Sequence, residues 1–151
     1  MPTARFLVTG VPCAVAPARH RILDTARRWI QLTPELADAV ELVTSELLTN
    51  AVVHAGGLIS VGLFAEHGRL LVEVFDGCPA GPRPRTATGV DETGRGLELV
   101  ALLSARCGWE PTPRGKKVWA EFAVAPDRAG HGTGTPPRGH RHVAGRGRHP
   151  G

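Results

Sequence analysis

Residues 41–54 read ELVTSELLTNAVVH, and this stretch decides the fold. Continued back to residue 36, it repeats apolar side chains three or four positions apart, the spacing that brings them to one side of an α-helix. The stripe consists of Leu36, Val40, Val43, Leu47 and Ala51. The pattern predicts an amphipathic helix whose apolar side packs on a core.

The two ends of this helix are also marked in the sequence. Thr33, Pro34 and Glu35 suit a helix start, because a hydroxyl caps free amides, proline fits the first turn and an acid favours the positive end of the helix dipole. Gly56 and Gly57 suit a helix stop. We therefore expect the helix to begin at Pro34 and to run up to the two glycines.

Three polar residues share the apolar side of the helix. Glu46, Asn50 and His54 are spaced four residues apart, with Asn50 and His54 inside the apolar stripe and Glu46 at its edge. A single buried Asn or His is usually satisfied by nearby backbone, and this is the alternative for each of them. Three in succession favour a polar site on the inner side of the helix.

Shorter elements surround this helix. Helical spacing of apolar residues predicts helices over 18–30 and from Gly96 to residue 105, and alternating or β-rich segments predict strands. The strands are expected at 5–11, 58–65, 70–75, 107–110 and 116–124. These elements predict an α+β fold, a two-layer α/β sandwich in which a mixed, mostly antiparallel sheet carries helices on one face.

Two further features suggest chemistry. Asp76 ends a β-rich strand and is followed by Gly77, so its carboxylate lies where a strand runs into a loop; a turn-forming Asp is the alternative. Residues 93–97, Thr-Gly-Arg-Gly-Leu, place two glycines directly before a helix, where backbone amides and the helix dipole can hold an anion. The Pro-, Gly-, Thr- and Arg-rich residues 77–93 predict a long functional loop between them.

Together these features resemble one known family. Residues 41–54 look like the asparagine box of the histidine kinase-like ATPases, residues 72–76 (VEVFD) resemble the strand leading to their adenine-binding Asp, and residues 94–97 (GRGL) resemble their second glycine box. Residues 115–122 (GKKVWAEF) are similar to the closing strand of small actinobacterial anti-sigma regulatory factors. The resemblance covers roughly residues 18–125 and implies a sandwich of the Bergerat type.

The resemblance also implies roles for matching residues. Asn50 would coordinate Mg²⁺ that bridges the phosphates of ATP, Glu46 would be the general base, and Asp76, with Gly77 beside it, would accept a hydrogen bond from the adenine amino group. The lid that cradles the phosphates would be formed by Thr93, Gly94, Arg95, Gly96 and Leu97. An Asn oxygen is a hard ligand suited to Mg²⁺, and a carboxylate one turn away can polarise a hydroxyl. His54 is expected only to pack or to satisfy the helix end.

The sequence departs from the family at two places. The first glycine box is Asp-x-Gly-x-Gly in the family, whereas here Cys78 and Ala80 occupy the second and fourth positions after Asp76, and Pro79 lies between them. Near Lys116 the family tends to place Thr in support of adenine binding. Both changes affect the expected geometry of nucleotide binding, but the polar residues that would bind adenine and metal are present.

The resemblance implies an ATP-binding regulatory protein. A sensor kinase or gyrase-like relative needs a further module, and the roughly 17 residues before the first helix favour the stand-alone class instead. The implied activity is that of an ATP-dependent protein serine/threonine kinase with anti-sigma activity. Such a kinase would act as a homodimer on a sigma factor or on a small anti-sigma-factor antagonist. The alternative is a nucleotide-gated binding module without phosphotransfer.

Charge is unevenly distributed along the chain. The net charge is +4 at pH 7, and residues 126–151 account for all of it, because residues 1–125 carry thirteen basic and thirteen acidic side chains. We expect an N-terminal strand or arm over 1–17, the ATP-binding domain over 18–125 and a disordered Gly-, Pro-, Arg- and His-rich tail over 126–151. Specific nucleic-acid binding by the tail is not favoured, since no aromatic-basic motif accompanies it.

The cysteines and the apolar runs bear on the compartment. Cys13, Cys78 and Cys107 are odd in number and form no Cys-x-x-Cys pair, which indicates neither a disulfide framework nor a zinc site. The N-terminus does not resemble a signal peptide, and no run approaches the roughly 18 apolar residues that span a bilayer. The sequence predicts a cytoplasmic protein without membrane association.

Overall fold

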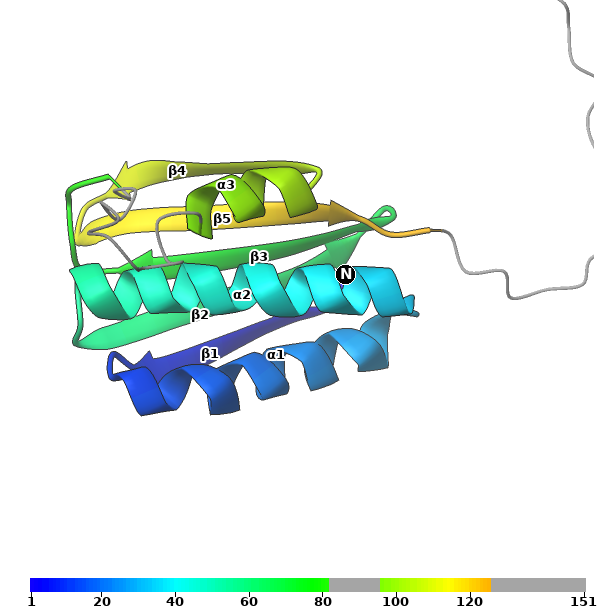
Figure 1. Ribbon diagram of the computed structural model, residues 1–151, viewed down its shortest axis with the longest axis horizontal. Coiled ribbons are helices and arrows are strands. Elements are labelled where there is room, and N and C mark those ends of the chain that lie inside the picture. The colour runs from blue at the N-terminus through cyan, green and yellow to red at the C-terminus, as the bar shows by residue number, and fades with distance from the viewer. Residues whose placement is uncertain (82–95, 126–151) are drawn as a thin grey trace, which may run out of the picture.

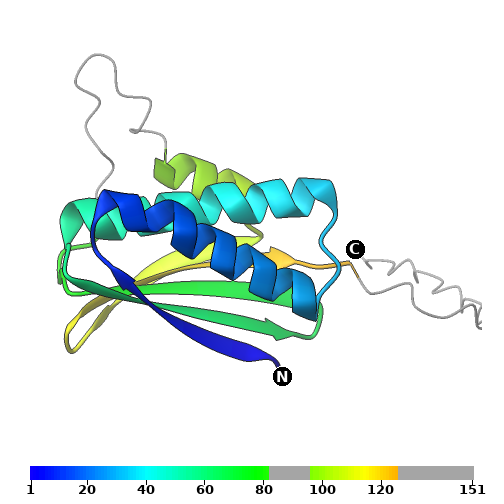
Figure 2. The same cartoon turned by 90° about the horizontal axis from the view of Figure 1, so that it is seen from below.

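The computed structural model describes residues 1–81 and 96–125, which form two layers (Figure 1). One layer is a sheet of β1 (Thr3–Thr9), β2 (Leu58–Glu66), β3 (Arg69–Asp76), β4 (Arg106–Thr112) and β5 (Gly115–Ala123). The other consists of α1 (Val15–Trp29), preceded by a 3₁₀ turn at Pro12–Ala14, α2 (Pro34–His54) and α3 (Gly96–Leu103). All three helices cover the same face of the sheet (Figure 2). The predicted α+β sandwich is confirmed.

The described strands pair in the order β1-β2-β3-β5-β4, and each neighbouring pair is antiparallel. β3 and β4 run in the same direction, but β5 separates them, so no parallel pair forms among these strands. The described sheet is therefore antiparallel throughout, not mixed as expected. β1 is an edge strand hydrogen-bonded to β2. In the β3–β5 pair, Asp76 lies directly opposite Lys116.

Helix α2 begins and ends where the sequence predicts. The hydroxyl of Thr33 accepts a hydrogen bond from the N–H of Leu36 at 3.2 Å, and Pro34 is the first helical residue. Gly56 and Gly57 follow the helix with φ values of 63° and 65°, a conformation that side chains other than glycine rarely adopt.

The core lies between α2 and the inner face of the sheet. The predicted stripe on α2 is buried except for Leu36, which is partly buried at its start. Leu48, outside that stripe, is also fully buried, because α1 and α3 flank α2 and cover a wider arc of its surface. The sheet contributes alternate side chains, namely Phe6, Val8, Ile59, Val61, Leu63, Leu70, Val72, Val74, Val118, Ala120 and Phe122.

Several boundaries differ from the sequence-based expectations. α1 begins at Val15, three residues early, and β4 covers seven residues where four were expected. The extra length of β4 comes from its pairing with β5 along its whole length, which local composition does not reveal. No helix in the described ranges is long and apolar enough to cross a bilayer. The expected tail and most of the expected loop over 77–93 lie outside the described residues.

We predict that Leu47→Ala lowers the free energy of unfolding by about 2–5 kcal/mol, the usual effect of emptying a buried leucine site. The Leu47 side chain is only 2% exposed, whereas Leu42 on the same helix is 40% exposed. Leu42→Ala is therefore the matched control and should cost less than about 1 kcal/mol. Urea denaturation measures both variants, and equal losses would mean that α2 is rotated about its axis relative to this packing.

Candidate functional site

Four segments meet at one end of the molecule. The last turns of α2, the end of β3, the start of β5 and the start of α3 lie together in both views (Figures 1 and 2), and α2 contacts the other three elements. These segments carry every described residue that the sequence assigns to the site: Glu46, Asn50, Asp76, Gly77, Gly96 and Leu97. Thr93, Gly94 and Arg95 lie outside the described residues.

Asn50 presents a buried oxygen at this end. The residue is 7% exposed, and its Oδ1 has no hydrogen-bond partner in the described part of the chain. A buried acceptor without a partner costs about 1–3 kcal/mol, so such atoms often mark a place for water, an ion or a ligand. An amide oxygen is also a hard ligand of the kind that binds Mg²⁺. Asn50 therefore fits the expected metal ligand.

Protein side chains alone do not complete a metal site here. Among residues 1–81 and 96–125, no group of three or more His, Cys, Asp or Glu side chains could hold a metal ion. Mg²⁺ usually keeps several waters and is bound through one or two protein ligands together with substrate phosphates. A single Asn oxygen is thus consistent with a cation that arrives with a nucleotide.

The carboxylate of Glu46 lies against the first residue of α3. A Cβ added to Gly96 would collide with Glu46 Oε2 and would lie 3.2 Å from Glu46 Cδ. A side chain at position 96 would therefore require the Glu46 carboxylate to move. The contact places the carboxylate at the positive end of the α3 dipole and one turn from Asn50. His54 is the last residue of α2, and its Nε2 is buried.

Asp76 forms a buried ion pair with Lys116. Lys116 Nζ lies 3.0 Å from Asp76 Oδ1 and 2.9 Å from Oδ2, and both side chains are 1% exposed. Oδ1 also accepts a hydrogen bond from the N–H of Cys78 at 2.9 Å. Asp76 thus forms the turn that the sequence allowed as an alternative. Its carboxylate lies on the inner face of the sheet, in line with Val72 and Val74, and the ion pair with Lys116 holds it there.

Sequence reasoning treated Lys116 as a departure from the family and missed its contact with Asp76. A signal was present, because Val118, Ala120 and Phe122 alternate on the inner face and Lys116 precedes them by the same period. Its partner depends on the register between β3 and β5, which a single sequence does not specify. The neighbouring Gly115 permits the close approach, since a Cβ there would collide with the carbonyl oxygen of Asp76.

Lys117, the next residue, faces the outer side of the sheet. Its Nζ lies 3.3 Å from Glu73 Oε1 and also contacts Glu110. A hydrogen bond to Glu110 raises the pKa of Lys117 above its ordinary value, and a hydrogen bond to Glu73 raises it further. Partial burial lowers the pKa but does not cancel this increase. The side chains of Lys116 and Lys117 therefore lie on opposite faces of the sheet.

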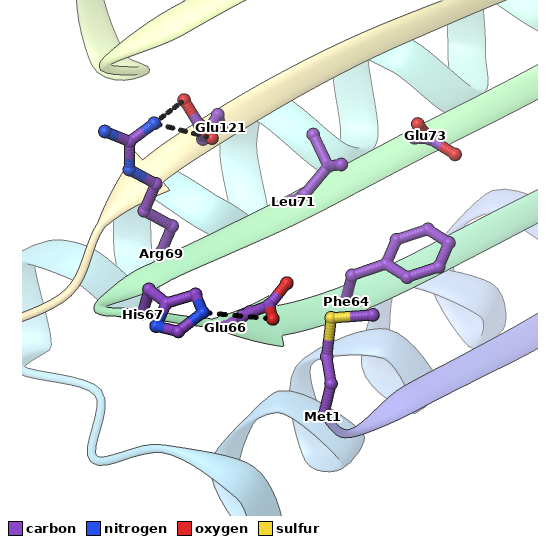
Figure 3. A pocket seen from close by; sticks show the side chains of 8 residues that line it. All are labelled: Met1, Phe64, Glu66, His67, Arg69, Leu71, Glu73 and Glu121. Atoms are coloured by element: carbon purple, nitrogen blue, oxygen red, sulfur yellow. Dashed lines mark hydrogen bonds and ion pairs between the residues drawn. The ribbon is translucent and has the colours of Figure 1, made fainter.

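A cavity of about 500 Å³ on the outer face is separate from this site (Figure 3). It is lined by Met1, Phe64, Glu66, His67, Arg69, Leu71, Glu73 and Glu121. Each of its carboxylates lies within 3.3 Å of a lysine, arginine or histidine nitrogen. The cavity contains none of the residues that the sequence assigns to the site.

Comparisons with known proteins bear on the fold and the family. A family model described as "Histidine kinase-like ATPase domain" matches residues 9–122. No curated protein matches the chain. One similar solved structure is that of the RsbU and RsbW domains of Rv1364c from Mycobacterium tuberculosis, with a TM-score of 0.64 and 14% identity. The match covers 82% of this chain and 33% of that one, so this chain spans about a third of that length, and the likeness is one of fold.

We predict that breaking the Asp76–Lys116 pair destabilises the protein. Lys116→Met and Asp76→Asn should each cost about 3–5 kcal/mol, because each leaves one buried charge without its partner. The double variant should cost less than the sum of the two losses, since it removes both charges. Urea unfolding of the four proteins gives the coupling energy, and strictly additive losses would show that the two side chains do not interact in solution.

Proposed function

The chain belongs to the histidine kinase-like ATPase domain family, and on this premise we propose that it is an anti-sigma-factor-like protein serine/threonine kinase. Family membership supports ATP binding. The anti-sigma assignment is supported by the resemblance of residues 115–122 to the closing strand of small anti-sigma regulatory factors, and the fold likeness to the RsbU and RsbW domains of Rv1364c is compatible with it. The proposed partner is a sigma factor or a small antagonist protein.

One observation carries this proposal. The buried Asn50 oxygen has no partner among the described residues, and it lies one helical turn from the carboxylate of Glu46 on α2. An acceptor and a carboxylate so placed suit two different tasks, holding a cation and accepting a proton. Mg²⁺, when bound, would neutralise charge on the phosphates of ATP.

In this proposal, different residues of the chain bind the base, the metal ion and the phosphates and accept the proton. Asp76 accepts a hydrogen bond from the adenine amino group, Asn50 is the metal ligand, and the backbone at Gly96 and Leu97 directs the N-terminus of α3 toward phosphate. Glu46 takes the proton of the partner's serine hydroxyl as that oxygen bonds to the γ-phosphorus and ADP leaves. Thr93, Gly94 and Arg95 complete the proposed lid.

The remaining assignments concern the setting of this site. We assign residues 18–125 to the ATP-binding domain, residues 1–17 to an N-terminal strand or arm, and residues 126–151 to a tail. The protein is proposed to act in the cytoplasm as a homodimer.

Asn50→Ala is predicted to abolish the metal dependence of nucleotide binding. In the presence of Mg²⁺ its affinity for ADP should fall by about tenfold or more, while its affinity in EDTA stays near the wild-type value, because only the metal ligand is lost. Thr49→Ala, one residue away on α2, is the matched control and should keep the wild-type response. Calorimetric titration measures all three proteins, and an Asn50→Ala protein that still gains affinity from Mg²⁺ would exclude Asn50 as the ligand.

Glu46→Gln is predicted to separate binding from catalysis. The variant keeps the size of the side chain and should bind Mg-ATP normally, but phosphate transfer should fall by about 10²–10⁴-fold, the usual effect of losing a general base. The assay follows radiolabelled phosphate from ATP to the partner that the protein captures from lysate. Glu35→Gln, at the exposed start of the same helix, is the control.

Two results would contradict parts of the proposal. Robust transfer by Glu46→Gln would remove Glu46 from the catalytic role. No transfer by the wild type, with ATP still changing its affinity for the partner, would favour the nucleotide-gated binding module without phosphotransfer.

A further inference from the structure

The Asp76–Lys116 pair has one acceptor position and one donor position left. An ionised carboxylate offers about four lone-pair positions, and an ammonium carries three hydrogens. Oδ1 accepts hydrogen bonds from the Cys78 N–H and from Lys116 Nζ, and Oδ2 contacts Lys116 Nζ in the ion pair, all at 2.9–3.0 Å. Within the described residues this leaves one lone pair on Oδ2 and one hydrogen on Nζ.

Bulk water does not reach the remaining lone pair on Asp76 Oδ2 or the remaining hydrogen on Lys116 Nζ. Both side chains are 1% exposed, and a buried charged pair that is only partly hydrogen-bonded is unfavourable. The pair lies on the inner face at the same end of the sheet as Asn50 and the Glu46–Gly96 contact. A ligand at this end that offers a donor directly beside an acceptor would complete both partners.

We propose that Lys116 is a specificity-determining residue for the nucleotide base, donating a hydrogen bond to N1 of adenine while Asp76 accepts one from the 6-amino group. The inference rests on the proposed function, which assigns adenine to Asp76. Adenine carries its amino donor next to the N1 acceptor, which is the complement of the acceptor and donor left on the pair. Guanine has an acceptor at position 6 and a donor at N1. In the same pose its O6 acceptor would face the Asp76 carboxylate, and its N1–H donor would face the Lys116 ammonium.

The order of donor and acceptor in the pair is set by the surrounding backbone. The Cys78 N–H holds Oδ1, and the close approach at Gly115 keeps the start of β5 against the end of β3. The carboxylate and the ammonium therefore cannot exchange places to suit another base. Because a charged donor forms hydrogen bonds roughly twice as strong as a neutral one, the contact with N1 should contribute strongly to base selection.

The test compares two ligands that differ at one atom. Full-length wild-type protein and Lys116→Met are titrated calorimetrically with ADP and with 1-deaza-ADP, in which C–H replaces N1, both with Mg²⁺. The wild type should bind ADP about tenfold to a hundredfold more tightly than 1-deaza-ADP, because a hydrogen bond to a charged group is lost. Lys116→Met should bind the two ligands within about twofold of each other.

Lys117→Met is the matched control, because Lys117 lies on the same strand and faces the outer side with Glu73 and Glu110. It should keep the wild-type ratio between the two ligands. A purely structural role for Lys116 would weaken both ligands equally and leave that ratio unchanged, which would overturn the inference.

Other outcomes are equally decisive. If the wild-type protein binds ADP and 1-deaza-ADP with nearly equal affinity, the inference is overturned without any substitution. The test therefore remains decisive even if the Lys116→Met protein is unstable. Tighter ADP binding by Lys116→Met also overturns it, because Lys116 would then compete with adenine for Asp76. If the wild type binds no ADP, the proposed function fails together with this inference, whereas ADP binding without preference over 1-deaza-ADP refutes the inference alone.

Discussion

Helix α2 has to bury one side along the full length of the sheet, and the arrangement of the site depends on this. The helix has 21 residues and is therefore about 31 Å long, close to the roughly 30 Å of a nine-residue strand such as β5. Once Val40, Val43 and Leu47 are packed on the inner face, the last turns of α2 necessarily reach the end where β3 stops and β5 starts. The packing that stabilises the fold thus also positions Asn50.

Core and site consequently share one face of the sheet, and burying the polar groups there lowers the stability of the fold. Asn50 Oδ1 and Thr44 Oγ1 are buried without hydrogen-bond partners in the described residues, and the Asp76–Lys116 pair carries two opposite charges out of water. Natural proteins tolerate such departures from an apolar core mainly where a ligand or a reaction requires them. Because these groups stand on helices and strands, their positions are set by packing before any ligand arrives.

Local patterns were sufficient to predict much of this arrangement. The cap at Thr33, the glycines after α2 and the apolar stripe each follow from residues a few positions apart, and all three appear in the structure. Contacts between segments distant in sequence were not predicted. The alternation of β5 indicated which face Lys116 takes, but only the β3–β5 register shows that it meets Asp76. Likewise, a glycine before a helix was expected to serve an anion, whereas its contact with Glu46 depends on how α2 and α3 pack.

The proposed function requires that the inner face at the end of β3 and α2 binds a nucleotide. The most direct measurement is a crystal structure of the full-length chain with ADP and Mg²⁺. We expect electron density for the base against Asp76 and Lys116 and for the metal ion at Asn50 Oδ1. The proposed function would be contradicted by a nucleotide bound elsewhere, for example in the outer-face cavity beside Phe64 and Leu71, with the inner-face residues contacting neither base nor metal.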